Sequence, residues 1–185
     1  MLDACNNPSA VQAAVDLANT LRPVKGEDAL ETVAQLRRFL DEHPAAAASR
    51  SAVTSADLTE VRAVRETVRA VLERANADPA ETAALINEGL RRNRVTPVVR
   101  HADDRWWIGV ASDSDRCAAH LAATTLSALA SVIATFGPAR LGVCAGPRCR
   151  ATFVDLSRNG SKQYCTRACA HRASVAAYRS RRSST

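Results

Sequence analysis

Residues 144–169 read CAGPRCRATFVDLSRNGSKQYCTRAC and contain four of the six cysteines of the chain. Cys144 and Cys149 are separated by four residues, Cys165 and Cys169 by three, and fifteen residues lie between the two pairs. Two close pairs joined by a loop of this length are typical of a structural zinc site, in which four thiolates surround one ion and leave no open position. The spacing therefore predicts one structural Zn²⁺. Two disulfides or an iron–sulfur cluster are the alternative uses of these residues.

The positive charge of the chain is concentrated around this cluster. Residues 140–185 contain 10 basic residues and one acidic residue, whereas residues 1–139 contain 15 basic and 18 acidic residues. A strongly basic segment beside a mildly acidic one favours a polyanionic partner, although a solvated tail has the same composition. A segment of 46 residues has too small a core to be stable by itself, and a bound metal would supply the additional folding free energy. We therefore expect two domains, residues 1–139 and residues 140–185.

A terminal helix is expected to begin inside the second cysteine pair, because Thr166 is a typical N-cap. At 100° per residue, Arg172, Arg179 and Arg182 lie within about 80° of arc on this helix. Such a stripe can contact phosphates, and base edges in a major groove. For Asn159, turn formation in residues 157–160 is an equal alternative to nucleic-acid contact. The residues expected to contact nucleic acid are Arg158, Asn159, Lys162, Arg167, His171, Arg172, Arg179 and Arg182.

The first domain is expected to be mostly helical, because its apolar residues recur with a helical period. N-capping residues mark four expected helix starts, at Ser9, Asp28, Ser55 and Asp78. On the third of these helices, Arg62 and Arg69 are expected on the solvated face, each paired with a glutamate four residues on. A fifth helix over residues 114–136 contains a stretch without charged residues. Since this stretch is rich in Ala, Ser and Thr, it is expected in the core rather than in a membrane.

The hydrophobic period changes to two in residues 95–100 and 105–110, which predicts a β-hairpin over about residues 95–110. Pro97 lacks an amide donor, so its strand is expected at an edge. Trp106 and Trp107 point to opposite faces, and one of them is expected to anchor the core. The predicted fold class is α+β: a mostly helical N-terminal domain with one β-hairpin, and a small C-terminal four-cysteine zinc finger with a terminal helix.

Several of these motifs resemble a known family. Cys144-x4-Cys149, residues 153–159 and Tyr164-Cys165-x3-Cys169-x2-Arg172 are similar to the CGNR zinc finger. Residues 15–21, VDLANTL, resemble the opening motif of the helical ABATE domain that precedes this finger. The resemblance implies a stress-induced transcription regulator that binds nucleic acid. The signature tetrapeptide departs from the family, because Ala170 and His171 stand in place of Gly and Asn.

Two features of these motifs have more than one interpretation. His171 is expected near the metal or a phosphate rather than as a ligand in place of Cys169. Asp16, Asn19 and Thr20 are expected to form a polar network that holds Arg22-Pro23, with ligand sensing as the alternative.

The expected function is that of a DNA-binding transcription regulator whose helical domain senses a small-molecule ligand or forms a homodimer. RNA binding by the same finger, or protein-interaction adaptor function, is the alternative. The sequence has no nucleophile–base set, phosphate-binding loop or histidine-rich metal site, so no enzyme activity and no catalytic residue is expected. Met1–Cys5 lacks a signal-peptide pattern, so a cytoplasmic location with no membrane partner is expected.

Overall fold

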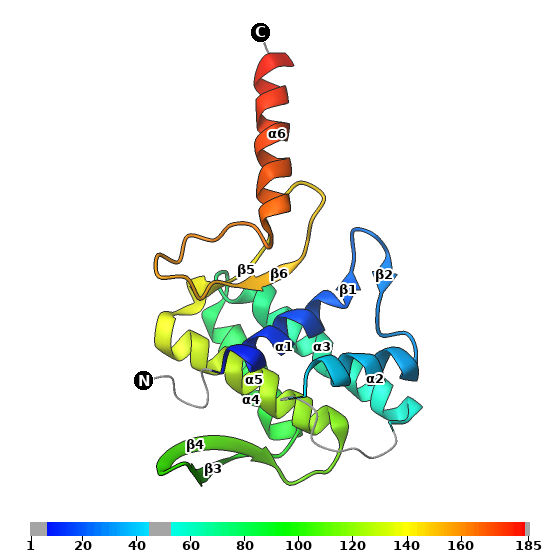
Figure 1. Cartoon of the computed structure of the whole chain (residues 1–185), viewed down its shortest axis with the longest axis vertical. Coiled ribbons are helices and arrows are strands. Elements are labelled where there is room, and N and C mark those ends of the chain that lie inside the picture. The colour runs from blue at the N-terminus through cyan, green and yellow to red at the C-terminus, as the bar shows by residue number, and fades with distance from the viewer. Residues whose placement is uncertain (1–6, 45–52, 184–185) are drawn as a thin grey trace.

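The computed structural model describes residues 7–44 and 53–183 of the chain, so Met1–Cys5 lies outside the described residues. The helices are α1 Pro8–Asn19, α2 Val33–Glu42, α3 Ser55–Arg74, α4 Pro79–Arg92, α5 Cys117–Phe136 and α6 Arg167–Ser183. The strands are β1 Leu21–Arg22, β2 Glu27–Asp28, β3 Val95–Ala102, β4 Arg105–Ser112, β5 Leu141–Val143 and β6 Thr152–Val154. The β3–β4 hairpin lies at one end of the helical body, and α6 projects from the opposite end (Figure 1). The predicted α+β class, mostly helical with a four-cysteine cluster followed by a helix, is confirmed.

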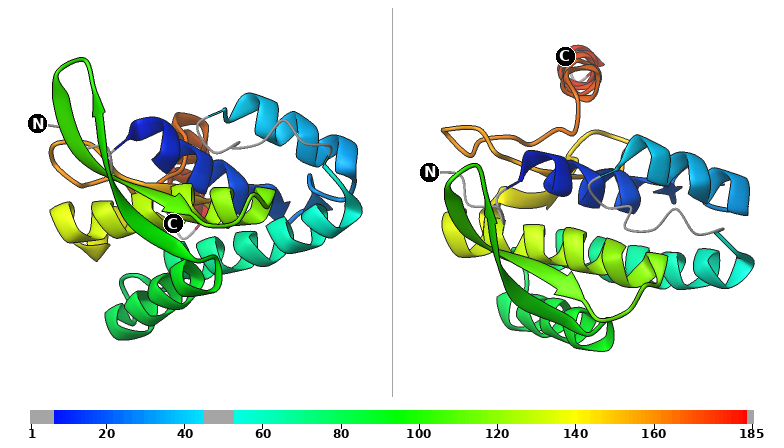
Figure 2. Two further views of the ribbon diagram at one scale, coloured as in Figure 1. Left: turned by 90° about the horizontal axis from the view of Figure 1, so that it is seen from below. Right: turned by 60° about the horizontal axis from the view of Figure 1, so that its bottom comes forward.

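Helix α5 lies inside the body and packs against α1, α3 and α4 (Figure 2). Its buried side chains include Leu121, Leu126 and Leu129. By length and composition alone, the helix could cross a membrane. Its packing among three other helices is the arrangement expected of a core helix. The helix ends at Phe136, as predicted, and Gly137 follows it with φ 84°.

The structure corrects three of the four predicted helix starts. The observed N-caps are Asn7, Thr32, Thr54 and Asp78, of which only the last was predicted. Thr32 and Thr54 each form a capping box with the residue three positions on, which satisfies two backbone donors at once. Asp28 instead lies in β2, where its carboxylate accepts hydrogen bonds from Leu30 N and from Arg65.

Three two-stranded antiparallel sheets occur in the described residues: β1–β2, β3–β4 and β5–β6. The predicted hairpin is present as β3–β4, while the other two pairs are additions to the prediction. The expectation that a tryptophan anchors the core is wrong, because Trp106 is 72% exposed and Trp107 is only half-buried. The reason is that residues 99–106 extend past the body into solvent, where no other element of the described chain covers them.

Arg69 of α3 was expected on the solvated face and is buried instead, although its predicted pair with Glu73 is present. Arg62 bonds to Leu30 O and Asp28 instead of pairing with Glu66 as expected. The neighbouring Arg65 is buried as well. The side chains of Arg65 and Arg69 are 5% and 7% exposed. Arg65 Nη1 lies 2.6 Å from Asp28 Oδ1, and Arg69 Nη1 donates to the carbonyls of Ala18 and Leu21. A guanidinium presents several donors in a fixed plane and can therefore satisfy the carbonyl groups at the end of a neighbouring helix.

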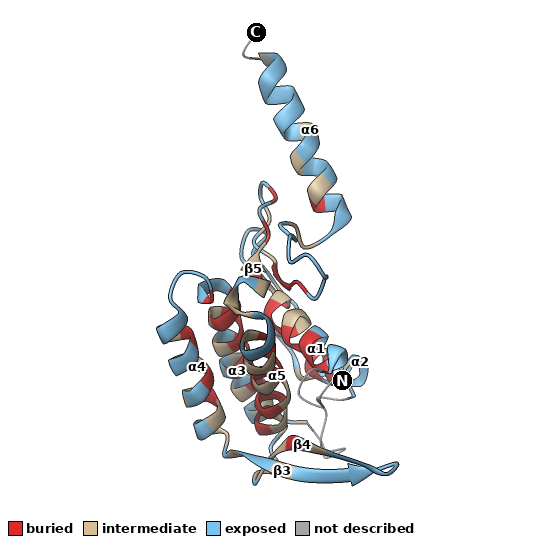
Figure 3. Cartoon of the chain, turned by 90° about the vertical axis from the view of Figure 1, so that its left-hand side faces the viewer, coloured by how far each residue is buried: buried red, intermediate tan, exposed pale blue. Residues whose placement is uncertain are grey.

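The β5–β6 hairpin continues the core of the helical body. Leu141 and Val154 belong to the same buried cluster as the apolar residues of the helices. Strands β5 and β6 both pack against α3, and β6 also packs against α1. Helix α6, by contrast, is exposed over most of its length (Figure 3). The segment after α5 therefore has two parts: the β5–β6 hairpin packs on the helical body, and α6 projects away from it.

Candidate metal centre and nucleic-acid interface

The four cysteine sulfurs converge on one point at the root of α6. Cys144 follows β5, Cys149 precedes β6, and Cys165 and Cys169 flank the start of α6. All four Sγ atoms lie within 4.8 Å of one another, with Cys149 and Cys165 at 3.8 Å and Cys165 and Cys169 at 3.5 Å. In a tetrahedral site with bonds of about 2.3 Å, sulfurs are about 3.8 Å apart. The cluster therefore fits one Zn²⁺. The described cysteines are free, so the two-disulfide alternative does not fit the structure.

Hydrogen-bond donors surround these sulfurs. The backbone N–H groups of Gly146 and Cys165 donate to Cys144 Sγ at 3.4 and 3.3 Å. Arg172 Nη2 donates to Cys169 Sγ at 2.9 Å. Four thiolates on one Zn²⁺ carry excess negative charge, and these donors offset part of it. Such an environment suits thiolates, which are the form of cysteine that binds a metal.

The thiols of the cluster differ in acidity. The hydrogen bond of Thr166 lowers the pKa of Cys169 to about 7. Burial raises the pKa of Cys149, and burial together with the neighbouring thiols raises that of Cys165. Metal binding therefore displaces protons from Cys149 and Cys165 in particular.

A buried carboxylate shapes the loop between the two cysteine pairs. Asp155 Oδ1 accepts from Ser157 N at 2.9 Å, and Oδ2 accepts from Lys162 N at 2.8 Å. Burial opposes ionisation of Asp155, but these hydrogen bonds and the nearby Arg140 charge lower its pKa overall. Arg140 Nη1 also donates to the carbonyls of Asp155 and Ser157. A Cβ on Gly160, which has φ +60°, would meet this guanidinium.

The predicted nucleic-acid residues lie at one end of the molecule but have different surroundings. Arg158 and Asn159 occupy an exposed turn of this loop. Lys162 Nζ donates to the Val154 carbonyl and lies 5.2 Å from the centre of the Phe153 ring. Arg172 contacts the metal ligand Cys169. The remaining predicted residues are exposed on α6: Arg167, His171, Arg179 and Arg182.

The polar residues of the VDLANTL motif lie in three separate sets of contacts. Asp16 accepts from Gln12 and lies 3.5 Å from His43 Nε2. Thr20 is buried and contacts Arg65. Asn19 bonds to Thr152 of β6, rather than to the expected Arg22-Pro23.

Sequence reasoning missed two further side chains that join the body to the finger. Arg69 Nη2 donates to the Arg150 carbonyl at 3.1 Å, and Asn76 Nδ2 donates to the Leu141 carbonyl at 2.7 Å. Both side chains come from α3 or its end, and both bond to backbone carbonyls. No sequence pattern indicates such partners, because any residue supplies a backbone carbonyl.

Two family models match the chain. Residues 12–135 match the ABATE domain, which is described as "Putative stress-induced transcription regulator". Residues 140–182 match the CGNR zinc finger, and this range includes all four clustered cysteines. A comparison with curated proteins found no match. The two matched ranges meet where α5 ends and the finger begins.

Proposed function

Because the chain belongs to the ABATE family of transcription regulators and carries a CGNR zinc finger, we propose that it acts by binding DNA through this finger. The observation that carries the proposal is α6, a basic helix that begins at the four-cysteine cluster and projects beyond the body (Figure 1). In this proposal the zinc is structural, no residue is catalytic, and the protein works in the cytoplasm, where thiols stay reduced.

The dimensions of α6 suit a major groove. The helix has 17 residues, which corresponds to a length of about 25 Å. The major groove is about 12 Å wide and admits a helix. From Ser174 to Arg182, Val175 is the one residue of α6 that is not exposed. Helices in proteins gain most of their stability by packing, so a partner along this face would stabilise α6.

The arginines of the finger have two different roles in this proposal. Arg172 holds the metal site through Cys169 Sγ. Arg167, Arg179 and Arg182 lie on the exposed part of the finger and are assigned to phosphate contacts, with His171 beside them. Phosphate contacts of this kind supply affinity and position the protein, while base contacts supply sequence preference.

Comparative binding of the zinc-loaded chain to duplex DNA, structured RNA and an acidic polypeptide tests the proposal. The double variant Arg179→Ala/Arg182→Ala should reduce the slope of log affinity against log salt by up to about 1.8 units on duplex DNA, since each phosphate contact contributes about 0.9. The matched control is Arg91→Ala/Arg92→Ala, which removes two exposed arginines that pair with Glu88 on α4.

The three ligands separate the candidate functions. A preference for single-stranded or looped RNA over duplex DNA at every salt concentration would replace DNA with RNA as the target. Binding to the acidic polypeptide with no binding to either nucleic acid would identify an adaptor. An unchanged salt slope in the α6 double variant would place the DNA contacts outside α6.

A further inference from the structure

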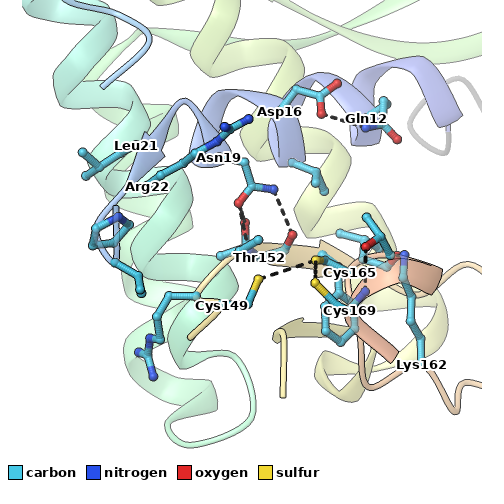
Figure 4. A pocket seen from close by; sticks show the side chains of 18 of the residues that line it. Gln12, Asp16, Asn19, Leu21, Arg22, Cys149, Thr152, Lys162, Cys165 and Cys169 are labelled. Atoms are coloured by element: carbon cyan, nitrogen blue, oxygen red, sulfur yellow. Dashed lines mark hydrogen bonds between the residues drawn. The ribbon is translucent and has the colours of Figure 1, made fainter. Parts of the chain in front are cut away.

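A groove of about 590 Å³ is lined by α1, the β1–β2 turn and the finger (Figure 4). Val11 and Val15 of α1 form part of one wall, and Phe153 and Leu156 form part of the other. Six basic residues also line the groove: Arg22, Lys25, Arg148, Arg150, Lys162 and Arg172. Asp16 is the single acidic residue among the described residues that line it. The groove thus combines apolar walls with an excess of positive charge.

Two of the basic side chains are available to a ligand. Arg22 and Lys25 pair with Glu27, Lys162 contacts Val154 and Phe153, and Arg172 donates to Cys169 Sγ. Arg148 and Arg150, on either side of Cys149, have exposed side chains without a hydrogen bond or ion pair to the described part of the chain. Exposed guanidinium groups that line the same groove suit a carboxylate or phosphate.

The apolar rim of the groove is also exposed in the described part of the chain. Val24 and Leu156 are 47% and 48% exposed, and both line the groove. An inorganic ion would leave these side chains in water, and the phosphates of a duplex would not cover them. The volume lies in the range of small-molecule sites.

From these observations we propose that the groove binds a small organic anion, with its apolar body between α1 and Leu156 and its carboxylate or phosphate group at Arg148 and Arg150. The root of α6 forms part of the same groove through Thr166, Cys169 and Arg172. An anion at this place cancels positive charge beside α6, so ligand binding weakens DNA binding. This regulatory part rests on the proposed DNA-binding function, whereas the ligand site itself does not.

The fluorescent probe 1-anilinonaphthalene-8-sulfonate, an apolar body with one anionic group, tests the site on the zinc-loaded full chain without DNA. We expect one bound probe per chain. Arg148→Ala/Arg150→Ala should raise the Kd about tenfold or more, because hydrogen bonds to charged groups are among the stronger ones. Leu156→Ser should also weaken binding. The control variants are Val99→Ser, which changes an exposed apolar residue of β3, and Arg91→Ala/Arg92→Ala.

Two further ligands test whether both chemical features are needed. N-phenyl-1-naphthylamine, which lacks the anionic group, and inorganic phosphate, which lacks the apolar body, should each bind at least about tenfold more weakly than the probe. Equal binding of the neutral analogue, or equal affinities in the groove variants and the wild type, would overturn the proposal. A loss of probe binding in Val99→Ser but not in Leu156→Ser would do the same.

Duplex DNA then tests the regulatory part. Saturating probe should weaken DNA binding by about fivefold or more, and DNA should weaken probe binding by the same factor, as linkage requires. A protein that binds no DNA at all would refute the proposed function, while the probe data alone would still decide the ligand site. Groove variants that weaken DNA binding but leave probe binding unchanged would assign the groove to the nucleic-acid interface and overturn the inference.

Discussion

The side-chain amide of Asn19 bonds to both backbone polar groups of Thr152. Its Oδ1 accepts from Thr152 N at 2.8 Å, and its Nδ2 donates to the Thr152 carbonyl at 3.0 Å. The two residues are 133 positions apart in sequence, one at the end of α1 and the other in β6. The amide therefore acts like an additional strand residue beside β6. It joins the ABATE domain to the finger at a point close to Cys149.

Replacing Asn19 with Ala should weaken this junction. The change leaves the backbone groups of Thr152, a residue 1% exposed, without partners. We expect a loss of about 1–3 kcal/mol in the free energy of unfolding. Urea denaturation of the zinc-loaded chain measures it. Asn87→Ala, at an exposed position of α4, is the control and should stay within about 0.5 kcal/mol of wild type. Equal stability of the two variants would contradict the role of Asn19.

Bound metal should stabilise α6, the part of the finger that projects from the body. Cys149→Ser removes one of four thiolates, so the variant should bind less than one Zn²⁺ per chain and lose the helical signal of α6. Leu141 and Val154 of the finger belong to the core of the helical body. Loss of the metal should therefore also lower the melting temperature of the body. Metal analysis and far-UV circular dichroism measure these effects.

The matched control for the metal site is Cys117→Ala. Cys117 lies in α5 and is not part of the four-sulfur cluster, so its thiol is not expected to bind this metal. This variant should retain one Zn²⁺ per chain. A zinc content that is unchanged in Cys149→Ser would show that this thiol is not a ligand.

Arg172 should stabilise bound zinc without any nucleic acid present. Its Nη2 donates to Cys169 Sγ at 2.9 Å. Since a hydrogen bond to a charged group contributes about 1.5 kcal/mol or more, Arg172→Ala should lose zinc to a chelator about tenfold faster. Arg167→Ala, one turn earlier on α6, is the control and should lose zinc at the wild-type rate. If Arg172 only contacted DNA, both variants would release zinc equally fast.

The ion pair of Asp28 and Arg65 should make stability depend on acid pH. Burial opposes ionisation of Asp28, but hydrogen bonds from Arg65 and Leu30 N and the charges of Arg65 and Arg62 lower its pKa overall. Because the folded pKa lies below the unfolded one, the carboxylate stabilises the protein above about pH 4. This contribution is lost as the pH falls through the folded pKa.

Asp28→Asn tests this linkage. The variant leaves the buried Arg65 without its main charged partner, so we expect a loss of about 3 kcal/mol at pH 7. The difference from wild type should shrink as the pH falls below about 4. Urea midpoints at several pH values measure it, and the contribution of the zinc thiolates cancels in the difference. Glu31→Gln, an exposed carboxylate nearby, is the control. A difference that does not change with pH would contradict the assigned ionisation.

Local sequence determined the features that short-range chemistry controls. Asp78-Pro79 starts α4 because cap and proline act within one turn. The alternation of residues 95–110 produced the β3–β4 hairpin, because pairing of adjacent segments needs only a short turn. The four cysteines were identified as one site because their spacing alone allows four sulfurs to reach one ion.

Tertiary structure alone decided the use of the polar side chains that join distant segments. Arg69 was expected on a solvated helix face, yet Arg69 and its neighbour Arg65 are both buried, because the end of α1 and β2 present acceptors to them. Asn19 was expected to help hold Arg22-Pro23, but its hydrogen-bond partner in the structure is Thr152. A polar side chain enters a protein interior only when its hydrogen bonds are satisfied there. Which segment supplies those bonds depends on how the helices pack, and no local pattern in the sequence records it.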